Sequence, residues 1–313
     1  MFEFKLLLIN VLLPSAVILL AVLAAWGGAP RAVSRREAVD AASLPGEPTA
    51  GDRSRGLQGV QRGTATLMTV AAVVAFALAF GLRTEFVLWP EDAWMRLSLG
   101  VTVVGVAAIL AVWIPWSPLA WAVRLLAVGL ATYGMIPRGE AWEFLLPSEN
   151  YWLAAMWLSV SVGWWSIVRR SPAQAAVLGL AWIPSVAAAA FLTAQSFLKV
   201  TEPLLAVASI LGWLSLFSWP RWSGALANAA AGPCLFALAA AVASAQFNSY
   251  LGLPDSLSWL AMSCPAIVGL LGLPWTSRGT AGHAAKSYVL LSVLSSLLLA
   301  AVVVGWTWKA TAV

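Results

Sequence analysis

Long apolar runs alternate with short polar segments along the whole of this 313-residue chain. Within a run such as TLMTVAAVVAFALAFGL, polar and apolar positions do not alternate, so the pattern predicts helix and not strand. About 20 apolar residues cross a hydrocarbon layer of roughly 30 Å. Ten runs have about that length: residues 6–26, 64–82, 97–115, 119–136, 152–168, 175–194, 203–219, 222–246, 257–275 and 288–308. The pattern predicts an all-α fold, with one polytopic membrane domain over residues 1–313 and about ten transmembrane helices.

The composition agrees with a membrane protein and suggests an orientation. Hydrophobic residues make up 61% of the chain and charged residues 10%, which is too apolar for soluble cores alone. An excess of Lys and Arg on cytoplasmic loops explains the net charge of +5, so we expect no nucleic acid partner. Placing residues 27–63 in the cytoplasm puts eleven Lys and Arg inside and six outside. We therefore expect both termini outside, in a membrane such as the inner (plasma) membrane of a bacterium.

Residues 27–63 form the one long hydrophilic segment, with mixed charge, Pro and Gly but no aromatic residue. Such a composition is typical of a flexible loop, although it would also suit a contact arm on the cytoplasmic face. A short helix over residues 34–43 is compatible with Ser34 as its cap. The apolar run before this loop is longer than the core of a signal peptide and is followed by several arginines, so we expect an uncleaved first helix.

Ten spans divide into two sets of five, and such a repeat would be inverted because five is odd. Spans two to five align with spans seven to ten at an offset of 138 residues. The identical pairs are Leu119 with Leu257, Trp121 with Trp259 and Gly134 with Gly272. Three identities in so biased a composition make the five-plus-five repeat a weak hypothesis.

Two loops on the outer side, residues 83–96 and 137–152, combine aromatic and acidic residues. This mixture suits segments that lie in the headgroup layer, with rings dipped and carboxylates in water. The alternative is a docking surface for a partner protein or a cationic ligand. Its candidate residues are Glu85, Glu91, Asp92, Glu140, Glu143 and Glu149.

Most of the 19 tryptophans lie near span ends, which predicts an aromatic belt at both interfaces. The stretch WIPWSPLAWAVRLL contains such an interface, where Pro115 and Pro118 end one helix and begin the next. Arg124 follows Pro118 by six residues, about 9 Å along a helix, so its backbone lies within the apolar layer. Its side chain either snorkels or pairs with carbonyls, or it faces the bundle and binds a ligand.

A ligand pocket around Arg124 would include Asn228 and Pro233, which lie at a similar depth in span eight. The pairs Gly232 with Pro233 and Cys264 with Pro265 predict helix interruptions, which can aim backbone groups at a substrate. No Asp or Glu falls inside a predicted span, so the pattern offers Arg124 no carboxylate partner. It also offers no acidic proton relay for an ion-coupled pump.

The inventory of catalytic residues is small. Cys234 and Cys264 form no CxxC pair and are expected to be packing residues. The single histidine, His283, falls in a predicted loop, so we expect no cofactor, no metal site and no enzymatic activity.

Three functions remain compatible with this sequence. The first is a non-enzymatic accessory or scaffold subunit that packs against a membrane protein partner, or forms a homo-oligomer, in the lipid bilayer. The second is a transporter or facilitator for a small anionic or neutral solute that binds near Arg124. The third is a lipid-modifying enzyme that uses the outer carboxylates.

Overall fold

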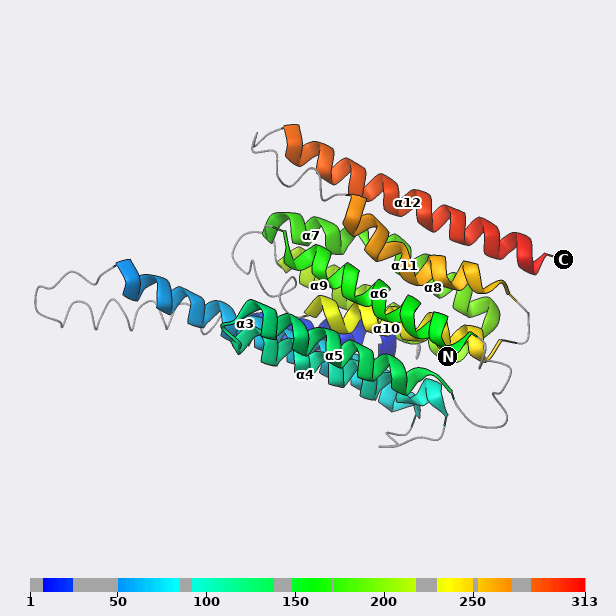
Figure 1. Cartoon of the computed structure of the whole chain (residues 1–313), viewed down its shortest axis with the longest axis horizontal. Coiled ribbons are helices and arrows are strands. Elements are labelled where there is room, and N and C mark those ends of the chain that lie inside the picture. Colours follow the sequence, from blue (N-terminus) through cyan, green and yellow to red (C-terminus); the bar gives the residue numbers. More distant parts are fainter. Residues whose placement is uncertain are drawn as a thin grey trace, which may run out of the picture.

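The computed structural model describes residues 8–24, 50–84, 92–137, 148–170, 172–217, 230–249, 253–271 and 283–312. These residues form a bundle of elongated helices (Figure 1) and contain no strand. The prediction of an all-α fold is therefore confirmed for this part of the chain.

Each predicted span coincides with a helix, or in one case with a pair of helices. The first helix, Leu8–Ala24, opens with a π-helical turn, η1 (Leu8–Leu12). The other elements are α3 (Ala50–Thr84), η2 (Ala93–Arg96), α4 (Leu97–Trp113), α5 (Ser117–Met135), α6 (Glu149–Val168), α7 (Pro172–Ala181), α8 (Ile183–Ser196), α9 (Leu198–Phe217), α10 (Ala231–Phe247), α11 (Asp255–Leu271) and α12 (His283–Thr311). Seven helical stretches among the described residues are long and apolar enough to cross a membrane, and three shorter ones are also apolar.

Helix α3 begins at Ala50, well before the predicted start at residue 64. The later part of the segment that was expected to be flexible is therefore helical. No proline follows Pro48 until Pro90, and extending an existing helix costs far less than nucleating a new one. The short helix predicted over residues 34–43 lies outside the described residues.

The two expected helix interruptions have different outcomes. Helix α11 runs unbroken through Pro265, so the interruption predicted at Cys264 and Pro265 is wrong. Pro233 lies in the first turn of α10, where proline is tolerated. Residues 218–229 lie outside the described residues, so the interruption predicted at Gly232 and Pro233 stays a prediction. A short interruption occurs instead between α7 and α8 at Trp182, where the backbone keeps helical dihedral angles, because Pro184 has no N–H to donate to the preceding turn.

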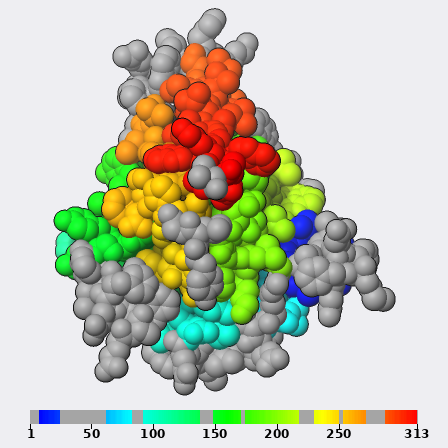
Figure 2. Space-filling view, turned by 90° about the vertical axis from the view of Figure 1, so that its right-hand side faces the viewer, coloured from blue at the N-terminus to red at the C-terminus, as the bar shows by residue number. Residues whose placement is uncertain are grey.

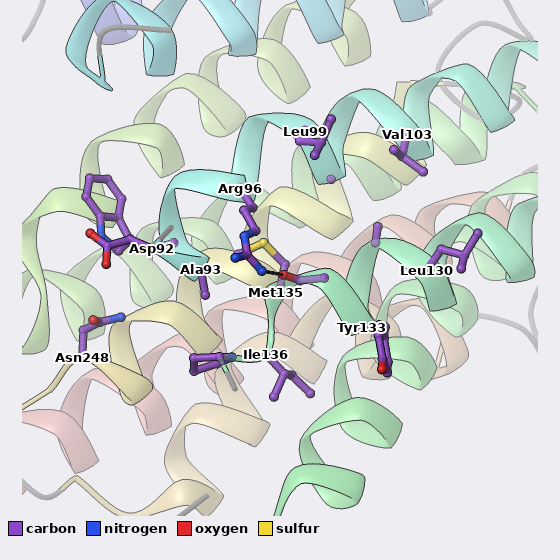
Figure 3. Close-up of a pocket in the computed structure, with 15 residues that line it drawn as sticks. Asp92, Ala93, Arg96, Leu99, Val103, Leu130, Tyr133, Met135, Ile136 and Asn248 are labelled. Carbon is purple, nitrogen blue, oxygen red and sulfur yellow. Dashed lines mark hydrogen bonds between the residues drawn. The ribbon is translucent and has the colours of Figure 1, made fainter. Parts of the chain in front are cut away.

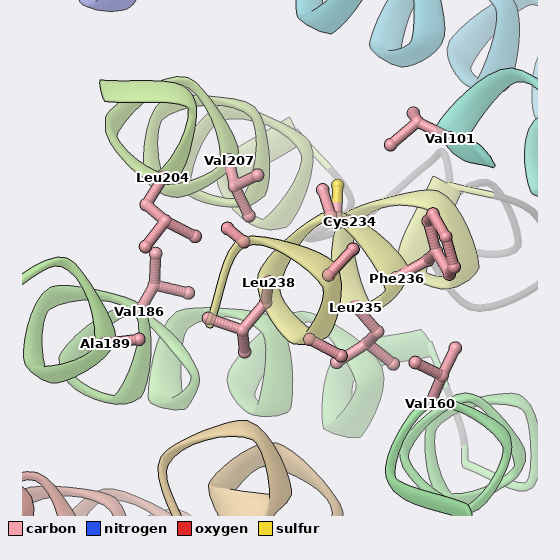
Figure 4. Close-up of a cluster of buried hydrophobic side chains, with 14 of the residues drawn as sticks. Val101, Val160, Val186, Ala189, Leu204, Val207, Cys234, Leu235, Phe236 and Leu238 are labelled. Atoms are coloured by element: carbon pink, nitrogen blue, oxygen red, sulfur yellow. The ribbon is translucent and has the colours of Figure 1, made fainter. Parts of the chain in front are cut away.

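Helix α10 runs through the centre of the bundle, enclosed by α4, α6, α8, α9 and α11. All of its residues except Gln246 are buried, and none is charged. Figure 4 shows apolar side chains from the surrounding helices, such as Val160 and Val207, directed at this central helix. An added Cβ at Gly100 of α4 would lie 2.4 Å from the ring of Phe236, so the close approach of α4 to α10 requires glycine.

Helix α12 lies at one edge of the bundle, where it packs on α7, α8 and α11. Its packed face includes Ser292, Ser296 and Val303, and the hydroxyls of Ser296 and Ser185 lie 3.2 Å apart. In a view onto one end of the bundle (Figure 2), α12 and the α4 region lie on opposite edges. We call this the Trp94 end, because η2 lies there, and the opposite one the Arg170 end.

Candidate functional site

A cavity of about 610 Å³ lies at the Trp94 end. It forms where η2 and the start of α4 meet the end of α5 and the residues that follow α10 (Figure 3). Its polar lining comes from Asp92, Arg96, Tyr133 and Asn248. The apolar lining includes Leu99, Val103, Leu130, Ala131, Met135 and Ile136. A volume of this size lies within the range of pockets that bind small molecules.

Arg96 connects the two helices that form this cavity. Its Nη1 atom donates to the carbonyl of Gly134 at 3.4 Å. The last carbonyls of a helix have no partner within the helix, so a cation is well placed at the end of α5. An added Cβ at Gly134 would meet nothing within 4 Å, because this residue borders open space. The guanidinium is partly exposed and lies at the cavity (Figure 3).

Trp94 fixes η2 to the bundle beside this cavity. Its ring makes edge contacts with Phe80 and Phe197, with centroids 6.1 Å and 5.7 Å away. The Lys199 ammonium lies 5.2 Å from the centroid of the same ring, within range of a cation–π interaction. The backbone that carries Asp92 and Arg96 is therefore held by a packed aromatic cluster.

Arg124 faces the helix bundle, not lipid, since only 6% of it is exposed. Its guanidinium carbon lies 4.8 Å from the ring centroid of Trp121 and 5.3 Å from that of Trp164. Desolvated cation–π contacts of this kind contribute about 2 kcal/mol each, which offsets much of the cost of placing an arginine in the apolar layer. The sequence analysis missed this aromatic environment, although Trp121 is three residues before Arg124 and so shares its helix face.

Trp164 lies next to both Arg124 and Gly232, the residue before Pro233. This ring is fully buried, and an added Cβ at Gly232 would lie 2.7 Å from it. Trp164 therefore occupies the space between Arg124 and the start of α10. Asn228, the third predicted member of the pocket, lies outside the described residues. Among the described residues, the buried indole Nε1 of Trp164 has no hydrogen-bond partner. None of these contacts tests the predicted ligand site, which stays a prediction.

The predicted acidic docking residues are only partly described. Asp92 is exposed and borders the cavity, and Glu149 begins α6 with a partly exposed side chain. The other candidates, Glu85, Glu91, Glu140 and Glu143, lie outside the described residues. Docking through these carboxylates stays a prediction.

A buried carboxylate within a helix corrects the sequence analysis. Glu202 is 5% exposed, and its Oε2 accepts a hydrogen bond of 3.3 Å from the Nδ2 of Asn10. The predicted span began at Pro203, but α9 begins one turn earlier, at Leu198, and contains this proline. The candidate membrane span Leu198–Phe217 therefore contains an acid that the predicted span 203–219 left out. Asn10 and Glu202 tie the first helix to α9, as does the 2.8 Å bond from Trp213 Nε1 to Ser15 Oγ.

Arg170 ties together three helices at the opposite end. The sequence placed it among the cytoplasmic loop cations, but it is 7% exposed. Its Nη2 donates to the carbonyl of Gly269 in α11, and its guanidinium carbon lies 4.8 Å from the Tyr288 ring in α12. Burial lowers the pKa of this guanidinium from its ordinary value, yet an arginine remains charged in proteins.

The described residues contain no group of three or more His, Cys, Asp or Glu side chains that could hold a metal ion. Cys234 and Cys264 are both buried, in α10 and α11, and are not joined in a disulfide. The backbone of His283 begins α12, so this residue is not in a loop as expected.

No family model matches the chain, and neither a curated protein nor a solved structure matches it. Function therefore has to be argued from the bundle itself.

Proposed function

We propose that this chain is a non-enzymatic membrane subunit, a rigid helix bundle that takes part in a membrane assembly through its surface. The observation that carries this proposal is the central position of α10. This helix is apolar, uncharged and buried along almost its whole length. Because its neighbours interlock with it through glycine contacts, the described core leaves little room for a polar path along its axis.

The proposed arrangement in the membrane has about ten crossings, with the Arg170 end in the cytoplasm and both termini outside. The larger number of Lys and Arg in the segments assigned to that side supports this orientation. A bacterial inner membrane is the proposed location.

The five-plus-five inverted repeat also remains a proposal, although its equivalent helices α6 and α12 have different surroundings, since α6 packs on α10 and α12 lies at the edge. Superposing residues 64–168 on residues 203–308 after a two-fold rotation tests the repeat.

Extraction from native membranes in a mild detergent, followed by mass measurement of the particle, tests the subunit proposal. We expect a stoichiometric companion protein, or a stable homo-oligomer. Glu149→Gln should weaken that association if the acidic residues at the Trp94 end dock the partner. Asp255→Asn is the matched control, because Asp255 is an exposed acid at the same end that is not among the predicted docking residues. A homogeneous monomer that a small solute stabilises against heat would contradict the proposal.

A small-solute transporter or facilitator is the second candidate. The burial of Arg124 beside Trp164 favours it, because ionisable residues inside membrane bundles often mark solute pathways. Uptake of a solute into vesicles that contain the chain, and its loss in Arg124→Gln, would support this function over the subunit proposal.

A lipid-modifying enzyme remains the third candidate, and neutralising Asp92 should then abolish its activity.

A further inference from the structure

The cavity at the Trp94 end joins a polar mouth to an apolar wall. Arg96 and Asp92 lie at the mouth, whereas Leu99 and Val103 line the wall deeper along α4. Val103 is seven residues beyond Arg96, which is about 10 Å along the helix axis. A ligand that fits this shape has a charged head group and an apolar chain.

The apolar wall continues along the bundle beyond the cavity. Leu99, Val103, Val106 and Leu110 follow one another at intervals of four, three and four residues, which places them on one face of α4. Val106 and Leu110 are 51% and 53% exposed. On the neighbouring helix α5, Leu130 lines the cavity and is 60% exposed. The cavity and this apolar face together form a groove between α4 and α5. This groove opens sideways onto the apolar surface of the bundle, where the hydrocarbon chains of a bilayer would lie.

The charges at the mouth define the head group. Arginine presents a planar array of five donors that suits a phosphate. Asp92 precedes Arg96 by one short 3₁₀ helix, and its exposed carboxylate can accept from an ammonium group. One cation and one anion on the same rim suit a head group that carries both charges.

We propose that the groove between α4 and α5 binds one zwitterionic phospholipid with a primary amine, from the leaflet at the Trp94 end. Its phosphate contacts Arg96, its amine contacts Asp92, and one acyl chain follows Leu99, Val103 and Leu130. This site is independent of the proposed subunit function, because it concerns a lipid ligand of the chain alone.

The test uses the full chain purified in detergent, with native mass spectrometry after titration with phosphatidylethanolamine or phosphatidylglycerol. We expect one phosphatidylethanolamine per chain, held more tightly than phosphatidylglycerol. Arg96→Gln should weaken its binding about tenfold, since it removes a charge-assisted hydrogen bond. Asp92→Asn should remove the preference for phosphatidylethanolamine. Arg169→Gln is the matched control and should bind as the wild type does, because Arg169 is exposed at the opposite end.

Val103→Trp keeps the inference testable even if Arg96→Gln fails to fold. It fills the apolar wall without touching the head-group residues, and we expect it to weaken binding of both lipids. Wild-type binding by folded Val103→Trp, or by folded Arg96→Gln, would overturn the proposed site. Tighter binding of phosphatidylglycerol than of phosphatidylethanolamine by the wild type would also overturn it.

Discussion

Arg96, the last residue of η2, and Arg124, within α5, have different surroundings. Arg124 is 6% exposed and lies against two tryptophan rings. Arg96 is partly exposed, donates to the end of α5 and borders a cavity. The first arrangement encloses a charge within the packed bundle, whereas the second places a charge beside a cavity. Among the described residues, Arg124 is therefore surrounded by closely packed side chains, whereas Arg96 borders open space.

The largest expected effect comes from Gly232→Ala, which would disrupt the packing around Trp164 and Arg124. Its new methyl group would lie 2.7 Å from the Trp164 ring, so Trp164 and its contact with Arg124 must move. Overpacking of this kind costs roughly 1–3 kcal/mol. Thermal unfolding in detergent measures the loss. Gly305→Ala is the control, because its methyl group would meet nothing within 4 Å, and equal melting temperatures for both variants would contradict the packing described here.

Arg124→Gln should come next, with a net loss of about 2 kcal/mol in the free energy of unfolding, because removing the buried charge also removes its desolvation cost and so offsets part of the two lost contacts. The substitution removes the cation that lies against the rings of Trp121 and Trp164, and leaves a buried amide in its place. A denaturant titration of the purified chain measures this difference. A variant with unchanged stability that loses solute uptake would show that Arg124 serves transport and not packing.

Asn10 and Glu202 should show a smaller, shared effect at the Trp94 end. Their side chains are both buried and joined by a hydrogen bond, and such bonds in membrane bundles contribute about 1 kcal/mol. A double-mutant cycle with Asn10→Leu and Glu202→Leu measures the coupling energy of unfolding. Additive losses in the double variant would mean that the two residues act separately.

Arg96→Gln should have the smallest effect on stability, within about 0.5 kcal/mol without added lipid. Arg96 is partly exposed beside the cavity, whereas Arg124 is 6% exposed. Comparing this variant with Arg124→Gln in the same denaturant titration therefore sharpens the contrast between the two arginines. Equal losses for both substitutions would contradict it.

The helices could be predicted from the sequence, because runs such as residues 97–115 and 152–168 are long, apolar and bounded by charge or proline. The runs do not show how each helix is rotated about its axis, and so which of its side chains face the bundle. Trp152 and Trp164 lie near the two ends of the predicted span 152–168 and so belong to the predicted aromatic belt, but both are buried. Trp113 and Trp116 are exposed, as a belt requires. Depth can be read from distance to a span end, but orientation depends on which helices become neighbours.

The candidate site could be predicted only in part, for the same reason. Arg124 was identified by its depth, but its contact with Trp164 depends on the packing of α5 against α6. The cavity beside Arg96 was missed, because its walls come from η2, α5 and the end of α10, which are far apart in the sequence. Glu202 was missed for a local reason, since Pro203 was taken as the start of a helix that begins at Leu198.

The two cysteines of the chain provide the most direct test of a closed, rigid core. Cys234 and Cys264 are 4% and 1% exposed, at the centre of the bundle in α10 and α11. In proteoliposomes, a water-soluble maleimide should therefore leave both thiols unlabelled, with or without added solutes, until a denaturing detergent exposes them. Labelling of Cys234 in the native protein, particularly if a small solute changes its rate, would reveal an aqueous path along α10 and contradict the account of a subunit that works through its surface.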